Sequence, residues 1–175
     1  FAVVGGRPVD QFQGALPDQH HSSGPVAVAD MDRDGRLDVF VGGRVIPGQY
    51  PLSPRSVLLK NGGGTFSDIA DSVPGLAQAG MVTGALWSDA NNDGWPDQIR
   101  IDMPGTHRVV WNENPKGKNQ HWVEHTLFRN ACNESPAFAP NGRHIAFNST
   151  RSGKEQIFTI ARDGKDLKQL TRLGN

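Results

Sequence analysis

The chain has 175 residues, and its eighteen basic and eighteen acidic side chains cancel to a net charge of zero. This balance argues against nucleic acid or a membrane surface as partner, because such partners select proteins of strong positive charge. No apolar run reaches the roughly 18 residues of a transmembrane helix, and a single cysteine, Cys132, excludes an intrachain disulfide framework. Glycine and proline together supply 33 residues (21 and 12), which favours many turns and few long helices.

Short β-type runs alternate with turn signals along the whole chain. The first predicted set of strands covers residues 25–29, 37–42, 56–60 and 65–69. The second set covers 82–87, 97–101, 108–112 and 122–128, and the third covers 135–139, 144–148, 156–161 and 167–171. Between the first two sets, residues 73–79 are expected to form a single helical turn. Four-strand units that recur at roughly 40–50 residues are typical of propeller blades.

We therefore predict an all-β chain of antiparallel four-stranded blades, arranged as a β-propeller or as part of one. Full blades are expected at residues 25–79, 80–130 and 131–175. Residues 1–24 are expected to be an N-terminal strand and linker from a partial blade, because FAVVGGR at 1–7 resembles VFVGGR at 39–44. Three blades are fewer than the four to eight of most propellers, so either self-association completes a ring or residues 1–7 close it.

Two acidic loops with one pattern, D-x-[DN]-x-D-G-x-x-D, are the most informative motif of the chain. They occupy residues 30–38 and 89–97. Ca²⁺ takes about six to eight oxygen ligands, and a tight glycine turn lets one short loop supply most of them. Four aspartates on one loop would also repel each other without a cation. The candidate side-chain ligands are Asp30, Asp32, Asp34 and Asp38 in the first loop, and Asp89, Asn91, Asp93 and Asp97 in the second. We predict two Ca²⁺ sites.

Other chemistries have little support in the sequence. An EF-hand needs a glutamate at loop position 12 and flanking helices, but that position is Val41 in the first loop and Arg100 in the second. The six histidines have no metal-ligand spacing, and no nucleophile-elbow, zinc-protease or phosphate-loop motif occurs. The four tryptophans are interpreted as packing between blades or, alternatively, as an aromatic platform for a sugar. They are Trp87, Trp95, Trp111 and Trp122.

Residues 25–130 resemble the FG-GAP/VCBS repeats of integrin-like β-propellers. The resemblance rests on VADMDRDGRLDVFVG, LLKNGGGTFSD, WSDANNDGWPDQIRI and VVWNENPKGKNQHWVEHTL. It implies that each acidic loop joins the first two strands of a blade and holds one Ca²⁺. It also implies that the main-chain carbonyls of Arg36 and Trp95 complete the two ligand sets.

Residues 134–175 (ESPAFAPNGRHIAFNSTRSGKEQIFTIARDGKDLKQLTRLGN) resemble a different repeat, the PD40 repeat of TolB-type propellers. The turn at Pro140, Asn141 and Gly142 takes the topological place of the acidic loops but lacks their carboxylates, so no metal is expected there. Two repeat families joined near residues 129–134 indicate a recombined or designed hybrid, or a fragment.

The combination favours a calcium-stabilised scaffold or binding module without catalytic activity. The candidate partners are a second copy of the chain and a glycan or protein ligand, with no nucleic acid and no membrane. Three alternatives remain open: a carbohydrate-binding, lectin-like propeller, a fragment of a larger propeller enzyme, and a shuffled protein without activity. A natural protein of this kind is expected to be secreted, periplasmic or on the cell surface. The start at Phe1 indicates processing, a fragment or engineering.

Overall fold

The structure is a computed structural model, and it describes residues 2–4, 7–9, 16, 22–103, 108–116, 121–129, 137–138, 143–161 and 163–172. Within these ranges the chain is all-β, apart from one 3₁₀ helix, η1 (Ala70–Ser72). The predicted fold class is confirmed at this level. Nowhere in these ranges is there a helix long and apolar enough to cross a membrane.

Apart from an N-terminal two-stranded hairpin, the described strands form three four-stranded antiparallel sheets, each with its strands in chain order. The first sheet contains β3 (Ser22–Ala29), β4 (Asp38–Val45), β5 (Val57–Asn61) and β6 (Phe66–Asp68). The second contains β7 (Met81–Ser88), β8 (Asp97–Met103), β9 (Arg108–Glu113) and β10 (Val123–Arg129). The third contains β11 (Ala137–Phe138), β12 (His144–Ser149), β13 (Gln156–Ala161) and β14 (Lys168–Gln169).

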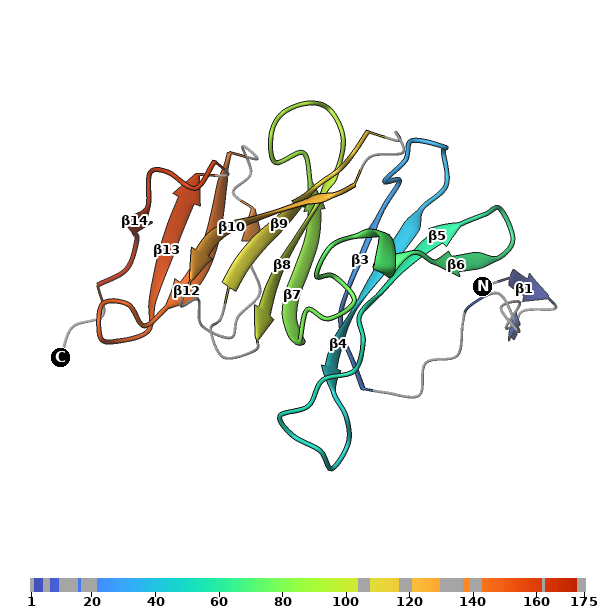
Figure 1. Ribbon diagram of the computed structural model, residues 1–175, viewed down its shortest axis with the longest axis horizontal. Helices are drawn as coiled ribbons and strands as arrows, with labels where there is room; N and C mark the ends of the chain where they lie inside the picture. Colours follow the sequence, from blue (N-terminus) through green and yellow to red (C-terminus); the bar gives the residue numbers. More distant parts are fainter. Residues whose placement is uncertain are drawn as a thin grey trace.

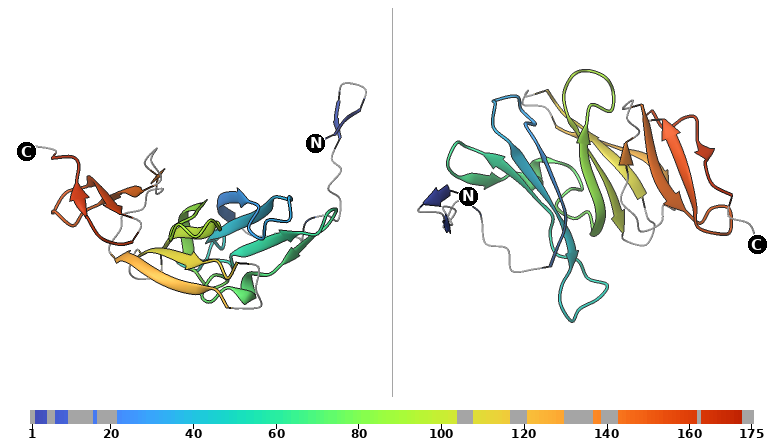
Figure 2. Two further views of the ribbon diagram at one scale, coloured as in Figure 1. Left: turned by 90° about the horizontal axis from the view of Figure 1, so that it is seen from above. Right: turned by 180° about the vertical axis from the view of Figure 1, so that it is seen from behind.

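The three sheets follow one another along an arc, and the described residues do not form a closed ring (Figures 1 and 2). The N-terminal residues do not close one either. β1 (Ala2–Val4) pairs with β2 (Arg7–Val9) in a separate hairpin and, in the described part of the chain, with no other strand. Within the described residues, the alternative in which residues 1–7 close a ring is therefore not realised.

The segment between the first two sheets also differs from its prediction. The helical turn lies at Ala70–Ser72 and not at residues 73–79, which instead form turns closed by the bonds Leu76 N–H to Val73 O and Ala79 N–H to Leu76 O. This segment packs its small and branched side chains into the core. The spacing of its apolar residues is therefore set by these packing contacts and not by a helical repeat.

The core between the first and second sheets is apolar and closely packed. It is built from Phe40 and Leu58 of the first sheet, Val82 of the second and Leu76 of the linking segment, all fully buried. Gly42 is required at this join, because a Cβ on it would lie only 2.7 Å from the Cβ of Val82. That close approach brings β4 directly against β7.

A second core lies between the second and third sheets. Ile99 and Ile101 of β8 pack there with Ile145 and Phe147 of β12 and with Phe158 of β13. The alternating burial along β12, in which every second residue is buried, is the pattern expected of a strand with one covered face. In the second sheet, β8 sends Ile99 and Ile101 toward the third sheet and the alternate residues, such as Arg100, toward the first.

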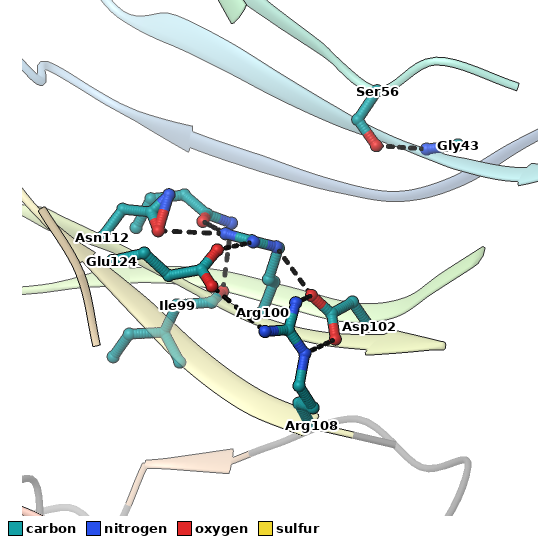
Figure 3. Close-up of polar contacts among 9 residues, drawn as sticks. Gly43, Ser56, Ile99, Arg100, Asp102, Arg108, Asn112 and Glu124 are labelled. Carbon is teal, nitrogen blue, oxygen red and sulfur yellow. Dashed lines mark hydrogen bonds and ion pairs between the residues drawn. The ribbon is translucent and has the colours of Figure 1, made fainter. Parts of the chain in front are cut away.

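The face of the second sheet that looks toward the first carries a buried charge network (Figure 3). The Arg100 guanidinium is fully buried and contacts Glu124 at 2.6 Å and Asp102 at 3.4 Å, while Arg108 binds the same two carboxylates at 3.1 and 2.8 Å. Burial raises the pKa of Asp102 even though both guanidinium groups oppose that shift. Arg100 also donates to the Oδ1 of Asn112 at 3.1 Å, so the network ties three strands together.

Candidate metal centres

The two acidic loops adopt the same turn, although they share few residues outside the motif. The first loop connects β3 to β4, and the second connects β7 to β8. In the first loop Arg33 and Gly35 have positive φ (60° and 84°), and in the second Asn92 and Gly94 match them (63° and 88°). Glycine at motif position 6 is explained by this left-handed conformation, which side chains with a Cβ rarely adopt.

The first aspartate of each motif organises the turn. Asp30 accepts hydrogen bonds from the N–H groups of Asp34 (3.0 Å) and Gly35 (2.9 Å). Asp89 accepts the equivalent pair from Asp93 and Gly94, both at 2.9 Å. The fifth residue then accepts from the N–H two positions later, Asp34 from Arg36 and Asp93 from Trp95. The turn is therefore closed by its own carboxylates.

The last aspartate of each motif is the first residue of the following strand and is fully buried. Asp38 accepts from the N–H of Met31 at 3.0 Å and from that of Asn61 at 2.8 Å. Asp97 accepts from Ala90 and Asn114, both at 2.8 Å. These contacts join each loop to the end of the third strand in its sheet.

Burial dominates the protonation of these two carboxyl groups. It raises the pKa of Asp97 to about 6, with the negative charges of Asp93 and Asp89 acting in the same direction against the N–H donors. Burial raises the pKa of Asp38 too, again reinforced by neighbouring aspartates. Each group therefore holds its negative charge less readily than a free carboxyl group does.

Three predicted ligands of the first loop converge. Oxygen atoms of Asp30, Asp32 and Asp38 all lie within 4.8 Å of one another. Asp32 Oδ1 is buried and has no hydrogen-bond partner among the described residues, while its other oxygen pairs with the Lys60 ammonium. Burial opposes ionisation of Asp32, but the hydrogen bond and positive charge of Lys60 outweigh it and lower the pKa of Asp32. This donor set, all carboxylate oxygens with one unsatisfied, fits the ligand preference of Ca²⁺.

The remaining predicted ligands of the first loop are placed differently. Asp34 turns its side chain to the Arg36 guanidinium, with which it forms an ion pair. The N–H of Arg36 donates to Asp34 Oδ1 at 2.9 Å. Both residues lie at the exposed rim of the loop.

The predicted ligands of the second loop do not converge in the same way. In the described part of the chain, a group of three carboxylates within ligand distance occurs at the first loop alone. Asp93 pairs with Lys116 at 3.0 Å, and the Asn91 side chain donates to Glu113 at 3.2 Å and accepts from the N–H of Asp93 at 3.1 Å. Burial works against ionisation of Asp93, but the Trp95 N–H and Lys116 lower its pKa. Trp95 packs under the Arg33 guanidinium of the first loop, 4.8 Å from the ring centre.

Two asparagines that support the loops were not predicted. The side chain of Asn61 donates to Leu37 O at 3.2 Å, and that of Asn114 donates to Pro96 O at 2.9 Å, so each holds the end of its own loop. Asn114 also donates to Met31 O of the first loop at 2.8 Å and so crosses between sheets. The available signal was an Asn at or directly after the end of the third strand in both sheets.

A cleft of about 680 Å³ lies beside the second loop, between the second and third sheets. Trp111 and His125 stack along its wall with ring centres 4.3 Å apart. The His125 ring contacts Glu113 at 3.0 Å, and Glu113 in turn accepts from Asn91. Asp163 lines the opposite wall from the third sheet. The volume falls within the roughly 300–1,000 Å³ of small-molecule sites.

The turn expected to lack a metal, at Pro140, Asn141 and Gly142, lies outside the described residues. Comparison with known proteins adds no family assignment: no protein-family model matches the chain, and no curated protein matches it with significance.

Proposed function

We propose that the chain is a calcium-stabilised scaffold or binding module without catalytic activity, built from β-propeller blades whose two acidic loops each hold one Ca²⁺. The observation that carries the proposal is the convergence of Asp30, Asp32 and Asp38 within 4.8 Å. The FG-GAP/VCBS-like and PD40-like sequence patterns extend it from antiparallel sheets to propeller blades. A location outside the cytoplasm or at the cell surface agrees with the weak, millimolar-range calcium sites of extracellular modules.

The proposed role of the ion is to hold the blade turns. When bound, Ca²⁺ supplies positive charge that offsets the mutual repulsion of the loop carboxylates. The residues of the chain do the rest. Asp30 closes the turn through two N–H donors, and Asp38 ties the loop to β5 through Asn61. In the first loop, Asp32 would exchange its contact with Lys60 for a contact with the ion.

Thermal unfolding with EGTA and with excess Ca²⁺ tests the proposal. A ligand at 100 times its Kd stabilises the folded state by about 2.7 kcal/mol. For a chain of this size each kcal/mol shifts the Tm by about 2–4 °C, so one filled site is expected to add roughly 5–11 °C. An unchanged Tm would contradict the calcium proposal.

Matched variants then locate the sites. Asp30→Asn and Asp89→Asn should each remove part of the calcium-dependent increase in Tm. Asp71→Asn should leave it intact, because the Asp71 side chain is 78% exposed and lies in η1, outside both loops. If all three variants respond alike, the ion acts through general surface charge and not through the loops.

The cleft supports a second candidate function, binding of a carbohydrate ring. The stacked Trp111 and His125 offer an aromatic wall, while Glu113 and Asp163 offer acceptors for hydroxyl groups. A glycan array probed with the protein in calcium tests it, and a blank array would reject it. For any glycan retained, His125→Ala should abolish the signal, whereas His121→Ala, an exposed histidine that does not line the cleft, should not.

A further inference from the structure

The outward face of the first sheet, at one end of the arc, carries two rows of apolar side chains. The strand pairings place Val26, Val41 and Val57 in one cross-strand row. They place Val28, Val39 and Leu59 in the second row. We call these six residues the valine face. Directly opposed residues share one face of a sheet, and the other face, with Ala27, Phe40 and Leu58, packs toward the second sheet.

The valine face is partly open to solvent. Val57 and Leu59 on β5 are only 4% exposed, but Val26 and Val28 on β3 are 58% and 50% exposed. β1 and β2 contact only each other among the described strands, so the N-terminal hairpin does not cover this face. The exposed part of the valine face is therefore its β3 edge, and an exposed apolar patch on a sheet can mark an interaction surface.

The corresponding face of the second sheet shows what kind of surface this is. Aligning the two acidic loops places Val39 with Gln98 and Val41 with Arg100. In the second sheet this face is buried against the first sheet and the linking segment, with Arg100 fully buried and Trp87 packed on the shared core. The same face on the first sheet therefore occupies the position of a sheet-to-sheet contact.

The opposite end of the arc offers the matching surface. Phe158 and Ile160 of β13 point toward the second sheet, so Ile157 points away from it. Ile157 is 45% exposed and Leu170 is 59% exposed. Leu170 directly follows β14 and donates its N–H to Ile157 O at 2.7 Å, so extending the β13–β14 register by one pair places it opposite Ile157 on the outward face. One molecule thus carries both halves of a further sheet-to-sheet contact, at the two ends of a curved row (Figure 2).

We propose that the valine face of one copy packs against the outward face of the third sheet of a second copy, and that two such contacts close a ring of six sheets. Head-to-tail contacts close into rings when the rotation between copies permits it, and six sheets lie within the usual range of about four to eight blades. This inference rests on the propeller architecture proposed above but not on calcium binding.

Molar mass in solution, measured by sedimentation equilibrium, tests the contact. A dimer of about 38 kDa, twice the 19.0 kDa of the chain, is expected. The double variants Val26→Asp/Val28→Asp and Ile157→Asp/Leu170→Asp should each shift the mass to that of the monomer. Leu52→Asp, at a residue 56% exposed but outside both faces, should remain dimeric.

Three results would overturn the proposal. A monomeric wild-type chain would show that neither face binds a second copy. Loss of the dimer in the Val26/Val28 variant alone would place the two valine faces against each other. Open polymers would show that the contact exists without closing a ring. Because each variant changes exposed side chains, circular dichroism should report an unchanged fold. The EGTA melting experiment separates failure here from failure of the calcium proposal.

Discussion

Asn114→Ala should destabilise the fold much more than Asn61→Ala, although the two asparagines hold equivalent positions. The Asn114 side chain makes three hydrogen bonds: to Met31 O at 2.8 Å, to Pro96 O at 2.9 Å and from the N–H of Lys116 at 2.9 Å. Its residue is 3% exposed. At about 0.5–1.5 kcal/mol for each bond, with carbonyls left unpaired in the interior, the loss should be about 2–4 kcal/mol.

The Asn61 side chain makes only two such bonds, to Leu37 O at 3.2 Å and from the N–H of Gly63 at 2.9 Å, and both are exposed to solvent. Its removal should therefore cost about 1 kcal/mol. In both variants the main-chain N–H remains available to Asp38 or Asp97. Expressed as Tm, the expected decreases are roughly 4–16 °C for Asn114→Ala and about 2–4 °C for Asn61→Ala.

Urea unfolding followed by tryptophan fluorescence, in EGTA so that no metal contributes, measures both variants on one scale. A larger loss of stability is expected for Asn114→Ala, because only Asn114 bonds across the two sheets. Equal losses would refute this expectation, since they would mean that the bond to Met31 O adds nothing to stability. A changed m-value would indicate an altered unfolded state and not a lost contact.

Three further changes have outcomes that follow from the geometry. In EGTA, the free energy of unfolding should fall by up to about 3 kcal/mol as the pH rises from 4 to 7. The reason is that the pKa of Asp97 is raised to about 6 in the folded state, so its proton is held more tightly there than in the unfolded chain. Arg100→Met should destabilise the protein by about 3–5 kcal/mol, since it leaves buried carboxylates short of a partner. Gly42→Val should reduce stability by about 1–3 kcal/mol through overpacking against Val82.

Each of these expectations has its own control. Asp97→Asn should reduce the pH dependence between 4 and 7 and leave the part that comes from Asp38 and Asp102, whose pKa values are raised too. A slope as steep as that of the wild type would assign the whole effect to other groups. Arg108→Met should be milder than Arg100→Met, because Arg108 is 24% exposed and Arg100 is not. The reverse order would contradict the burial argument. For Gly42, the control is Gly64→Val, which should change little because a Cβ on Gly64 meets no atom within 4 Å.

Strand positions and loop chemistry were predictable from the sequence for local reasons. Apolar alternation and the aspartate–glycine turns lie within a few residues of each other, so β4 and β8 and their preceding loops could be placed directly. The N-terminal pairing could not be predicted. Residues 1–7 resemble residues 39–44, the strand after the first acidic loop, and this resemblance does not distinguish a local pairing from a pairing with a distant sheet.

Long-range partners were the part that sequence could not supply. Asn114 precedes a proline and so resembles an ordinary turn residue, and its bond to Met31 O depends on two sheets being packed face to face. The convergence at the loops was also only partly predictable. Asp30, Asp32 and Asp38 meet, whereas Asp93 is drawn to Lys116, a residue that follows a different strand and has no place in the nine-residue pattern.

The two contacts between neighbouring sheets differ in kind, and this difference implies that unfolding is not equally cooperative along the chain. β3 and β4 approach β7 at main-chain range, but the described strands of the second and third sheets meet only through side chains. Hydrogen exchange should therefore show the first two sheets opening as one unit, with the amides of β12 and β13 exchanging through a separate, less costly opening. A contact made by side chains alone is also one across which a sheet can be exchanged without disturbing the backbone of its neighbour. The third sheet behaves in this sense as a replaceable module.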